Sequence, residues 1–363
     1  MFPSQPTTTW LEHFKLEHDN LRAALQWCIT ERRHPLLGAR LAAALGRYWF
    51  ERGLFREGRL WLMQSLEAHT DPIDPYTDAK IRLYLAFAAN YESDYLAGEA
   101  AAQEALTAYM QTNDRAGAAQ ARNALGIAAM YTGRYLDAER YFGESLFEHR
   151  ALEDRRGIAV ALHNLGEIAA EFHSDFPTAR ARFVESLAIF RELEHMTNVA
   201  CTLGVLSEMA VHLGEIDEAV HSGREALAIH TDLGNRPLIA EEMARIGRCE
   251  LLRGNVDDAR RMLRSALEQM EISFNARHVA RCFEAVAHLA ASSGDPERGA
   301  RFLGFSERVR DAHNIARSPA LQREHARLVE SIRIGLAAPD YDASRRRGYE
   351  LAPEQAFSEA RSL

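Results

Sequence analysis

Small and apolar residues recur along most of the chain in a fixed arrangement that predicts pairs of amphipathic helices. The clearest pair spans residues 120–151. Its first helix carries Leu125 and Gly126 on one face, and its second helix carries Ala138 and Phe142 on one face. Neither helix can bury its apolar face alone, so the pair requires neighbours of the same kind.

The residue expected at the turn between the paired helices repeats every 40 residues, with one spacing of 41. These turn residues are Gly53, Ser93, Gly133, Ser174, Gly214, Gly254 and Gly294. A small residue follows every turn at a constant distance, where two helix backbones can approach closely, and leucines recur further along the second helix. The pattern predicts an all-α protein, a right-handed α-solenoid of about seven helix-turn-helix repeats.

The segments that flank the array also read as mostly helical. Residues 1–9 are rich in Thr, Pro and Ser and are expected to form a disordered tail. Residues 10–34 form an N-terminal helical segment, and the sequence leaves open whether a break divides it. The seven repeats then occupy residues 35–317. Residues 318–363 are expected to form capping helices, because a solenoid must cover its last apolar face.

Composition and charge exclude several classes of function. The chain is 47% hydrophobic and 26% charged, as expected for a protein with a packed core. Its formal net charge of -9 argues against nucleic acid as a partner, because nucleic-acid binders present a basic face. The N-terminus lacks the pattern of a secretory signal, and no apolar run of about 18 residues predicts a membrane span.

Cysteine and lysine usage also limit the chemistry. The four cysteines are widely spaced and are expected to be reduced, structural thiols of a cytoplasmic protein rather than a disulfide framework or a zinc site. Lys15 and Lys80 are the only lysines, and neither follows a GxxxxGK[ST] loop. A Walker-type phosphate site is therefore not expected, and no cofactor is assigned.

The repeated motif resembles a known family. The order Leu-Gly, small, aromatic, small, as in Leu125-Gly126, Ala138, Phe142 and Ser145, resembles the tetratricopeptide repeat. That repeat usually has about 34 residues, so each unit here is about six residues longer. The extra residues are expected to lengthen the second helix.

Two further stretches narrow the resemblance. Residues 16–25, Leu-Glu-His-Asp-Asn-Leu-Arg-Ala-Ala-Leu, resemble the first helix of the C-terminal repeat region of bacterial STAND-type signalling ATPases, including LuxR-like regulators. Residues 294–304 and 348–356 resemble the last repeat and the closing helix of that region. The resemblance implies a sensor segment attached to a nucleotide-binding switch domain. Since neither that domain nor a DNA-binding helix-turn-helix is in this sequence, ATP hydrolysis and DNA binding do not transfer.

Polar residues on the first helix of each pair are candidates for a binding groove, because these helices line the concave side of such arrays. The candidates are Arg40, Arg47, Lys80, Asn90, Tyr91, Gln120, Asn123, Tyr131, His163, Glu167, Glu171, Glu208, His212, Glu241, Arg248, Arg281, Glu284 and His288. They are basic in the first two repeats, acidic in the fourth and fifth, and mixed in the last two. Such a gradient suits recognition of a peptide or protein segment; the alternative is that a hollow surface is simply wet and polar.

Metal binding and catalysis are not predicted. His163, Glu167 and Glu171 share one helix face, and Glu208 and His212 take similar places one repeat later. Imidazole and carboxylate can bind a divalent metal, but such pairs are common on exposed helices and no HExxH motif is present. A salt-bridged or peptide-binding face is the preferred interpretation. No spacing indicates paired catalytic acids or a nucleophile with its base.

These observations predict a non-enzymatic binding domain, the sensor or scaffold part of a bacterial signal-transduction or transcription regulator. Its partner would be a protein or peptide in the groove, or a small-molecule effector, and neither nucleic acid nor a membrane is expected to bind. A free-standing peptide receptor or adaptor of the quorum-sensing type is the alternative. An enzyme is the least favoured class.

Overall fold

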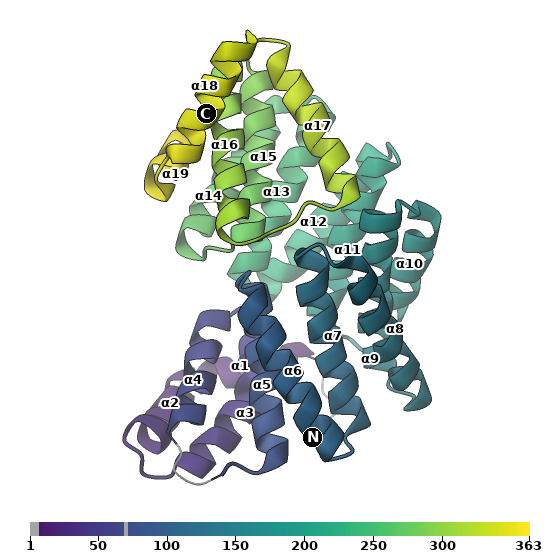
Figure 1. Cartoon of the computed structure of the whole chain (residues 1–363), viewed down its shortest axis with the longest axis vertical. Helices are drawn as coiled ribbons and strands as arrows, with labels where there is room; N and C mark the ends of the chain where they lie inside the picture. The colour runs from purple at the N-terminus through teal and green to yellow at the C-terminus, as the bar shows by residue number, and fades with distance from the viewer. Residues whose placement is uncertain (1–6, 69–71) are drawn as a thin grey trace. The chain divides into compact units, whose positions relative to one another are not determined.

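The computed structural model describes residues 7–68 and 72–363, and these residues form α-helices with no strand among them (Figure 1). Consecutive helices form repeated hairpins, which confirms the predicted all-α repeat solenoid. Of the predicted disordered tail, residues 1–6 lie outside the described residues, whereas residues 7–9 begin the first helix, α1 (Thr7–Leu16).

Seven hairpins follow one another along the chain, each joined by one of the predicted turns. Their helices are α3 (Pro35–Glu51) and α4 (Phe55–Glu67), α5 (Pro75–Tyr91) and α6 (Tyr95–Gln111), α7 (Arg115–Tyr131) and α8 (Tyr135–Ala151), α9 (Arg155–Ile168) and α10 (Phe176–Glu192), α11 (Met196–His212) and α12 (Ile216–Leu233), α13 (Arg236–Leu252) and α14 (Val256–Ile272), and α15 (Ala276–Ser292) and α16 (Pro296–Ala312).

Two helices and a π-helical turn precede the hairpins. The break that the sequence left open falls at Glu17, since α1 ends one residue before it and α2 (His18–Leu25) begins one residue after it. A π-helical turn, η1 (Gln26–Thr30), continues α2. Trp10 and Ile29 of this segment are buried, so it is part of the core.

All seven turn residues adopt the left-handed backbone conformation. Gly133 has a φ of 84° and Gly254 a φ of 87°, which glycine adopts without strain. Ser93 and Ser174 adopt φ values of 64° and 57°, which cost non-glycine residues about 1 kcal/mol or more. Sequence spacing therefore identified a backbone requirement and not only a residue preference.

The single spacing of 41 residues has a local cause. In the fourth hairpin α9 continues into a π-helical turn, η2 (Ala169–His173), directly before Ser174. A π-helical turn contains one more residue in its hydrogen-bonded ring than an α-helical turn. The extra residue is thereby absorbed, and the later repeats keep the same arrangement.

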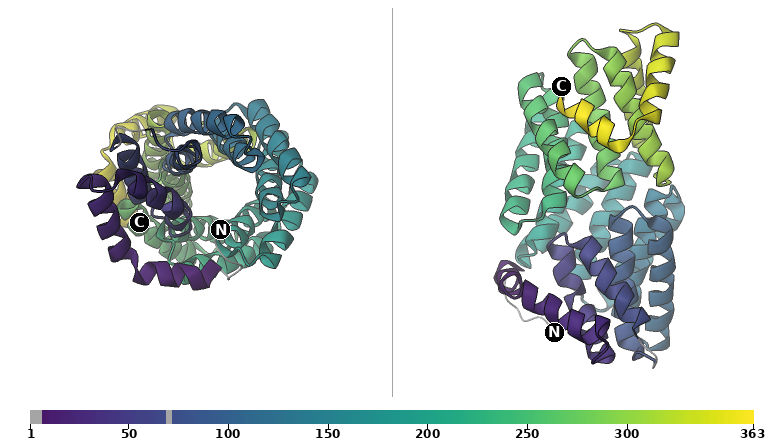
Figure 2. Two further views of the ribbon diagram at one scale, coloured as in Figure 1. Left: turned by 90° about the horizontal axis from the view of Figure 1, so that it is seen from below. Right: turned by 90° about the vertical axis from the view of Figure 1, so that its left-hand side faces the viewer.

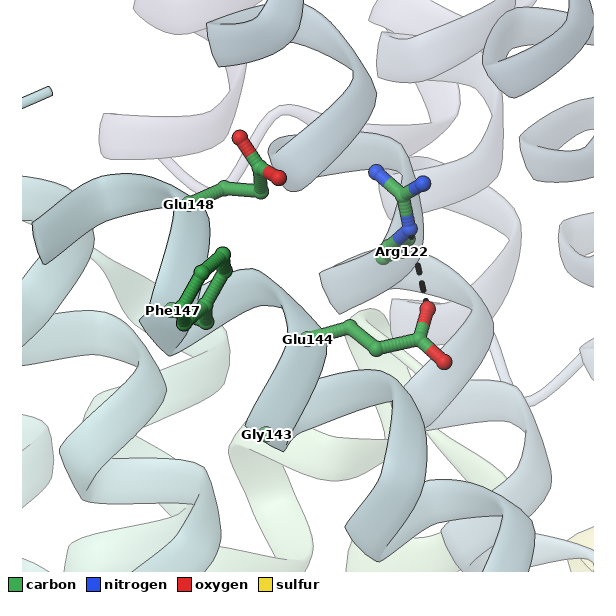
Figure 3. A pocket seen from close by; sticks show the side chains of 5 residues that line it. All are labelled: Arg122, Gly143, Glu144, Phe147 and Glu148. Carbon is green, nitrogen blue, oxygen red and sulfur yellow. Dashed lines mark hydrogen bonds and ion pairs between the residues drawn. The ribbon is translucent and has the colours of Figure 1, made fainter. Parts of the chain in front are cut away.

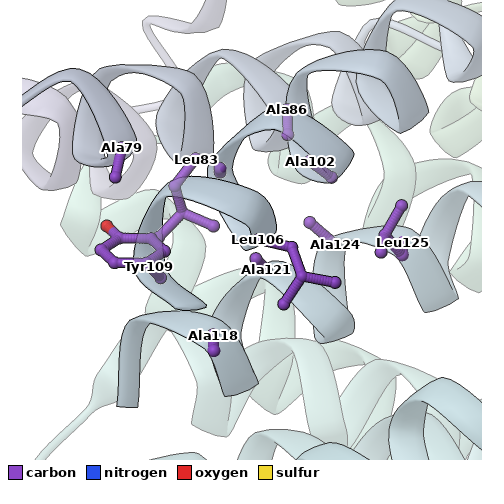
Figure 4. Packing of buried hydrophobic residues seen from close by; sticks show 11 residues of the cluster. Ala79, Leu83, Ala86, Ala102, Leu106, Tyr109, Ala118, Ala121, Ala124 and Leu125 are labelled. Carbon is purple, nitrogen blue, oxygen red and sulfur yellow. The ribbon is translucent and has the colours of Figure 1, made fainter. Parts of the chain in front are cut away.

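Small residues set the close approach of the helices. Figure 4 shows alanines and leucines of α5, α6 and α7 pointing toward one another, among them the fully buried Ala86 and Ala102. A Cβ atom added at Gly126 would lie only 2.4 Å from the Phe142 ring, and one at Gly166 would lie 2.6 Å from the Phe183 ring. The glycine of the Leu-Gly motif is therefore required by an aromatic ring on the paired helix.

Contacts between Cα atoms divide the chain into two compact units. Unit 1 comprises Met1–Ile168 and Ala181–Val199, and unit 2 comprises Ala169–Arg180 and Ala200–Leu363. Unit 1 therefore holds the first three hairpins and most of the fourth, and unit 2 holds most of the last three and the C-terminal helices.

Three helices complete unit 2 after the last hairpin: α17 (Pro319–Arg333), α18 (Ala338–Glu350) and α19 (Pro353–Arg361). The yellow helices α18 and α19 pack on the green end of the array (Figure 2). The backbones of α16 and α18 touch, because a Cβ at Gly348 would lie 1.8 Å from the Arg301 carbonyl oxygen, and one at Gly304 would lie 2.0 Å from that of Arg345. Thus α18 covers the end of the array.

Candidate functional site

Unit 2 gathers six charged side chains from three successive first helices. They are Glu208 of α11, Glu241, Glu242, Arg245 and Arg248 of α13, and Arg281 of α15, and we refer to them as the unit 2 cluster. Glu208 Oε1 lies 2.7 Å from Arg281 Nη2 and 3.3 Å from Arg248 Nη2. One carboxylate therefore joins three repeats.

Burial strengthens the interactions between the charges of this cluster and shifts the pKa values of its carboxyl groups. Arg245 is 8% exposed and Glu242 is 2% exposed. Burial raises the pKa of Glu242 to about 7, although the Arg245 charge opposes this shift. Burial would also raise the pKa of Glu208, but the three arginines override it and hold that pKa well below its usual range. Gly204 makes room for the pair, since a Cβ there would lie 2.3 Å from Arg245 Nη1.

Helix α17 contacts this cluster through a single carboxylate. Glu324 Oε2 lies 3.0 Å from Arg248 Nη1, and Glu324 Oε1 lies 3.3 Å from His212 Nε2. At the start of α17, the Ser318 hydroxyl donates a hydrogen bond to Glu171 of η2. The structure thus brings five of the sequence-predicted residues of unit 2 into contact with one another or with α17, and the local sequence gave no sign of α17 there.

The other predicted residues of unit 2 are Glu241, which belongs to the cluster, and Glu284 and His288 of α15. Glu241 Oε2 lies 3.0 Å from His278 Nε2. Glu284 Oε1 lies 3.1 Å from Arg310 Nε and 3.3 Å from Arg317 Nη2. His288 is half-buried, and burial lowers its pKa.

Unit 1 has a smaller polar group around Arg47. Its guanidinium lies 3.1 Å from His195 Nε2 and 3.5 Å from Glu51 Oε1, and it stands 5.3 Å from the centroid of the Trp10 ring. Burial lowers the pKa of His195 to about 4, so this imidazole is neutral near pH 7. Arg40 lies at the exposed start of α3, 3.5 Å from Asp74.

Lys80 differs from the other charged candidates. It is half-buried on α5, and it forms no ion pair with any residue that the structure describes. Burial lowers its pKa, and no neighbouring carboxylate offsets this effect. The residue that corresponds to Lys80 in the next repeat is Gln120. By contrast, the matching positions of the last two repeats, Glu241 and Arg281, are neutralised within the unit 2 cluster.

The predicted asparagines of unit 1 hold neighbouring helices together. Asn90 Nδ2 donates to the carbonyl oxygen of Ala124 at 2.9 Å. Asn123 Oδ1 accepts from Asn164 Nδ2 at 2.6 Å, and both side chains are buried.

The predicted aromatic residues lie where successive hairpins meet. Tyr91 stacks on Phe55 with ring centroids 3.6 Å apart, and Tyr131 stacks on Tyr95 at 5.4 Å. In unit 2, His212 stacks in the same way on Phe176 at 5.1 Å. Each pair is separated by 36 residues, and that constant spacing is the sequence signal that could have identified the contact.

His163 and Glu167 lie on one face of α9, with Nε2 and Oε2 4.0 Å apart, and the His163 ring meets the edge of Phe183. Burial lowers the pKa of His163 to about 4. Within residues 7–68 and 72–363, no three His, Cys, Asp or Glu side chains form a group that could hold a metal ion.

A shallow hollow of about 410 Å³ lies between α7 and α8 (Figure 3). It is lined by Arg122, Gly143, Glu144, Phe147 and Glu148, and Arg122 Nε donates to Glu144 Oε2 at 3.0 Å. None of the sequence-predicted residues lines it. Among the helices that the structure describes, none has the length and apolar character needed to cross a membrane.

Comparison with known proteins agrees with this architecture. Residues 198–272 match the tetratricopeptide repeat family. No curated protein sequence matches the chain.

Several solved structures are similar over most of the chain. A Rap protein complexed with competence and sporulation factor is 16% identical, with a TM-score of 0.53, over 70% of this chain and 76% of that chain. The Rap conjugation gene regulator of plasmid pLS20, in complex with the Phr* peptide, is 18% identical, with a TM-score of 0.58, over 77% and 74%. Aspartyl phosphate phosphatase F from Bacillus subtilis is 15% identical, with a TM-score of 0.56, over 77% and 74%. The chain therefore has the fold of a tetratricopeptide-repeat solenoid.

Proposed function

We propose that the chain is a non-enzymatic binding protein, and that the first helices of unit 1 bind a peptide or protein segment through Lys80. The observation that carries this proposal is the half-buried ammonium group of Lys80, which has no ion-pair partner among the described residues. A partly desolvated cation gains more from an incoming carboxylate than an exposed one does. The complementary ligand group is a peptide carboxylate, from an acidic side chain or a C-terminus.

Polar side chains on the first helices before and after α5 suit the rest of such a ligand. Gln120 carries an amide that can both donate to and accept from a peptide backbone. Arg47 of α3 adds a guanidinium on the same series of first helices, where it also contacts Glu51 and His195. The net charge of -9 disfavours nucleic acid as the ligand of this surface. A small-molecule effector with a carboxylate would use the same contact.

The wider role that we propose is that of a sensor or scaffold in a bacterial signal-transduction or transcription regulator. The resemblance of residues 16–25 and 294–304 to STAND-type regulators supports this role. A free-standing peptide receptor is the second candidate, and it is favoured by the similar Rap structures in complex with a peptide or with competence and sporulation factor. An in-frame nucleotide-binding domain encoded upstream would favour the first role. The free thiols of the four cysteines accord with a cytoplasmic location.

Binding of a random peptide pool tests the proposal. The full chain is incubated with soluble hexapeptides that carry free C-termini, and the peptides that co-elute with it are identified by mass spectrometry. Affinity for a retained peptide is then compared in the wild type and in Lys80→Met, which keeps most of the apolar stem. We expect Lys80→Met to weaken binding at least about tenfold, or roughly 1.4 kcal/mol.

Lys15→Met is the matched control, because Lys15 is the only other lysine and is exposed on α1, 3.4 Å from Glu12. It should leave the affinity unchanged. Retention of no peptide at all would contradict the proposed function. Equal affinity of wild type and Lys80→Met would remove Lys80 from the site.

A further inference from the structure

We propose that unit 2 contains a second binding site, for a helix of a protein partner that carries a carboxylate, and that α17 occupies this site in the absence of the partner. The site is the surface formed by His212 of α11 and Arg248 of α13, where Glu324 of α17 is bound. It lies in unit 2 and does not depend on the proposed role of Lys80.

The carboxylate position is built by residues that other contacts hold in place. Arg248 offers one guanidinium nitrogen to Glu324 at 3.0 Å, while its other terminal nitrogen lies 3.3 Å from Glu208. The His212 ring, 3.3 Å from Glu324, is stacked on Phe176. Because Glu208 and Phe176 fix the two groups independently of α17, the position persists when Glu324 leaves it.

Helix α17 itself buries few of its side chains completely. Only Ala320 and Ile332 of its residues are buried, and they lie near its two ends. By comparison, α15 buries residues in every turn. The other contacts of α17 include hydrogen bonds from Ser318 to Glu171 and from Arg323 to Ser174. The hydrogen bond from Arg323 is exposed and therefore weak, and only two side chains of α17 are buried, so the helix is held less firmly than a core helix.

The end of the array does not need α17 as its cap. The backbone contact at Gly304 and Gly348 already fastens α18 to α16. Figure 1 shows α17 beside α15, and Arg333 at the C-terminal end of α17 contacts Tyr341 and Asp342 of α18. Non-helical residues 313–318 and 334–337 separate α17 from its neighbours in sequence. Helix α17 thus packs on α15, α16 and η2 and is joined to its neighbours in sequence by non-helical residues.

A helix tethered in this way competes strongly with a free one, because a short tether gives it an effective concentration in the millimolar range. Weakening the attachment of α17 should raise the fraction of chains in which the site is open. The apparent affinity for a helix supplied in trans should rise by the same factor. The probe is a fluorescent synthetic peptide of residues 317–334, titrated against the full chain and followed by fluorescence anisotropy.

We expect the Glu324→Gln chain to bind this peptide at least about tenfold more tightly than the wild-type chain does. A peptide with Gln at the same position should bind the Glu324→Gln chain more weakly than the Glu peptide does. Glu330→Gln, on an exposed position of α17, is the matched control and should behave like the wild type. Equal binding by the wild type and Glu324→Gln, or equal binding of the Glu and Gln peptides, would overturn the proposal.

Hydrogen exchange of the wild-type chain provides a second test that uses no substitution. Amides of α17 should exchange at least about tenfold faster than those of α15 and α18, because α17 opens locally while the array stays folded. Equal protection of α17 and α18 would show that α17 is a fixed part of the array and would overturn the proposal.

Discussion

The role of the Leu-Gly motif is best tested by removing the aromatic ring that faces it. Phe142 is 0% exposed on α8, and its ring occupies the place that a side chain at Gly126 would need. Phe142→Ala removes the ring where the surrounding backbone is held by both paired helices, so a cavity should remain. Buried Phe→Ala substitutions cost about 3–5 kcal/mol, and we expect a loss in that range.

The same helix offers a matched control. Phe147 is 69% exposed on α8, where it lines the shallow hollow beside Gly143. Phe147→Ala deletes the same atoms from a site in contact with water, so its effect should stay within about 0.5 kcal/mol. Urea unfolding followed by circular dichroism measures both variants, with the midpoint and slope compared to the wild type. Similar losses for the two variants would refute the assignment of Phe142 to the contact between paired helices.

Glycine and histidine substitutions test the packing further. Gly143→Ala should stabilise the chain by about 0.5–1 kcal/mol in urea unfolding, since a Cβ there meets no atom within 4 Å, whereas Gly126→Ala should destabilise it. His230 is fully buried, and burial lowers its pKa to about 4. As the pH falls below about 6.5, the His230 imidazole is protonated in the unfolded chain before it is protonated in the folded chain. Stability that is present at pH 7 is therefore lost toward pH 4. His230→Leu should remove about 2 kcal/mol of the stability lost between pH 7 and pH 5; an unchanged pH profile of the urea midpoint would contradict this.

The forty-residue period predicted the hairpins because it reflects local requirements that recur in each one. A left-handed backbone is needed at Gly53 and its six counterparts, and space for a ring is needed at Gly126. Both requirements restrict residue type directly, so they are visible in a single sequence. The extra residue in the fourth repeat was visible as a spacing, but its accommodation in a π-helical turn, η2, was not.

The position of α17 could not be predicted in the same way. Ser318 and Pro319 signal the start of a helix, and the Ser318 hydroxyl indeed accepts from the Leu321 amide at 3.1 Å. Where the helix then packs depends on Glu324 and Arg248, which are 76 residues apart. No periodic pattern links these two residues, so the sequence suggested only that the C-terminal helices form a cap.

The candidate site shows the same division between local and long-range information. The helical period placed Glu208, Arg248 and Arg281 on first helices, and the structure joins them in one cluster. The helical period alone did not distinguish these three residues from Tyr91, whose ring packs between hairpins. The sequence analysis missed Arg245 and Glu242. In the sequence, a buried Arg-Glu pair three residues apart on a helix cannot be told from an exposed one, because burial depends on the neighbouring helices.

The central claim is that Lys80 receives a peptide carboxylate, and the chain contains only one other lysine side chain to compare with it. Limited acetylation followed by mass spectrometry therefore reports the reactivity of Lys80 and Lys15 separately. At a concentration of retained hexapeptide ten times its Kd, acetylation of Lys80 should slow about tenfold while that of Lys15 stays unchanged. Unchanged acetylation of Lys80 under these conditions would contradict the account.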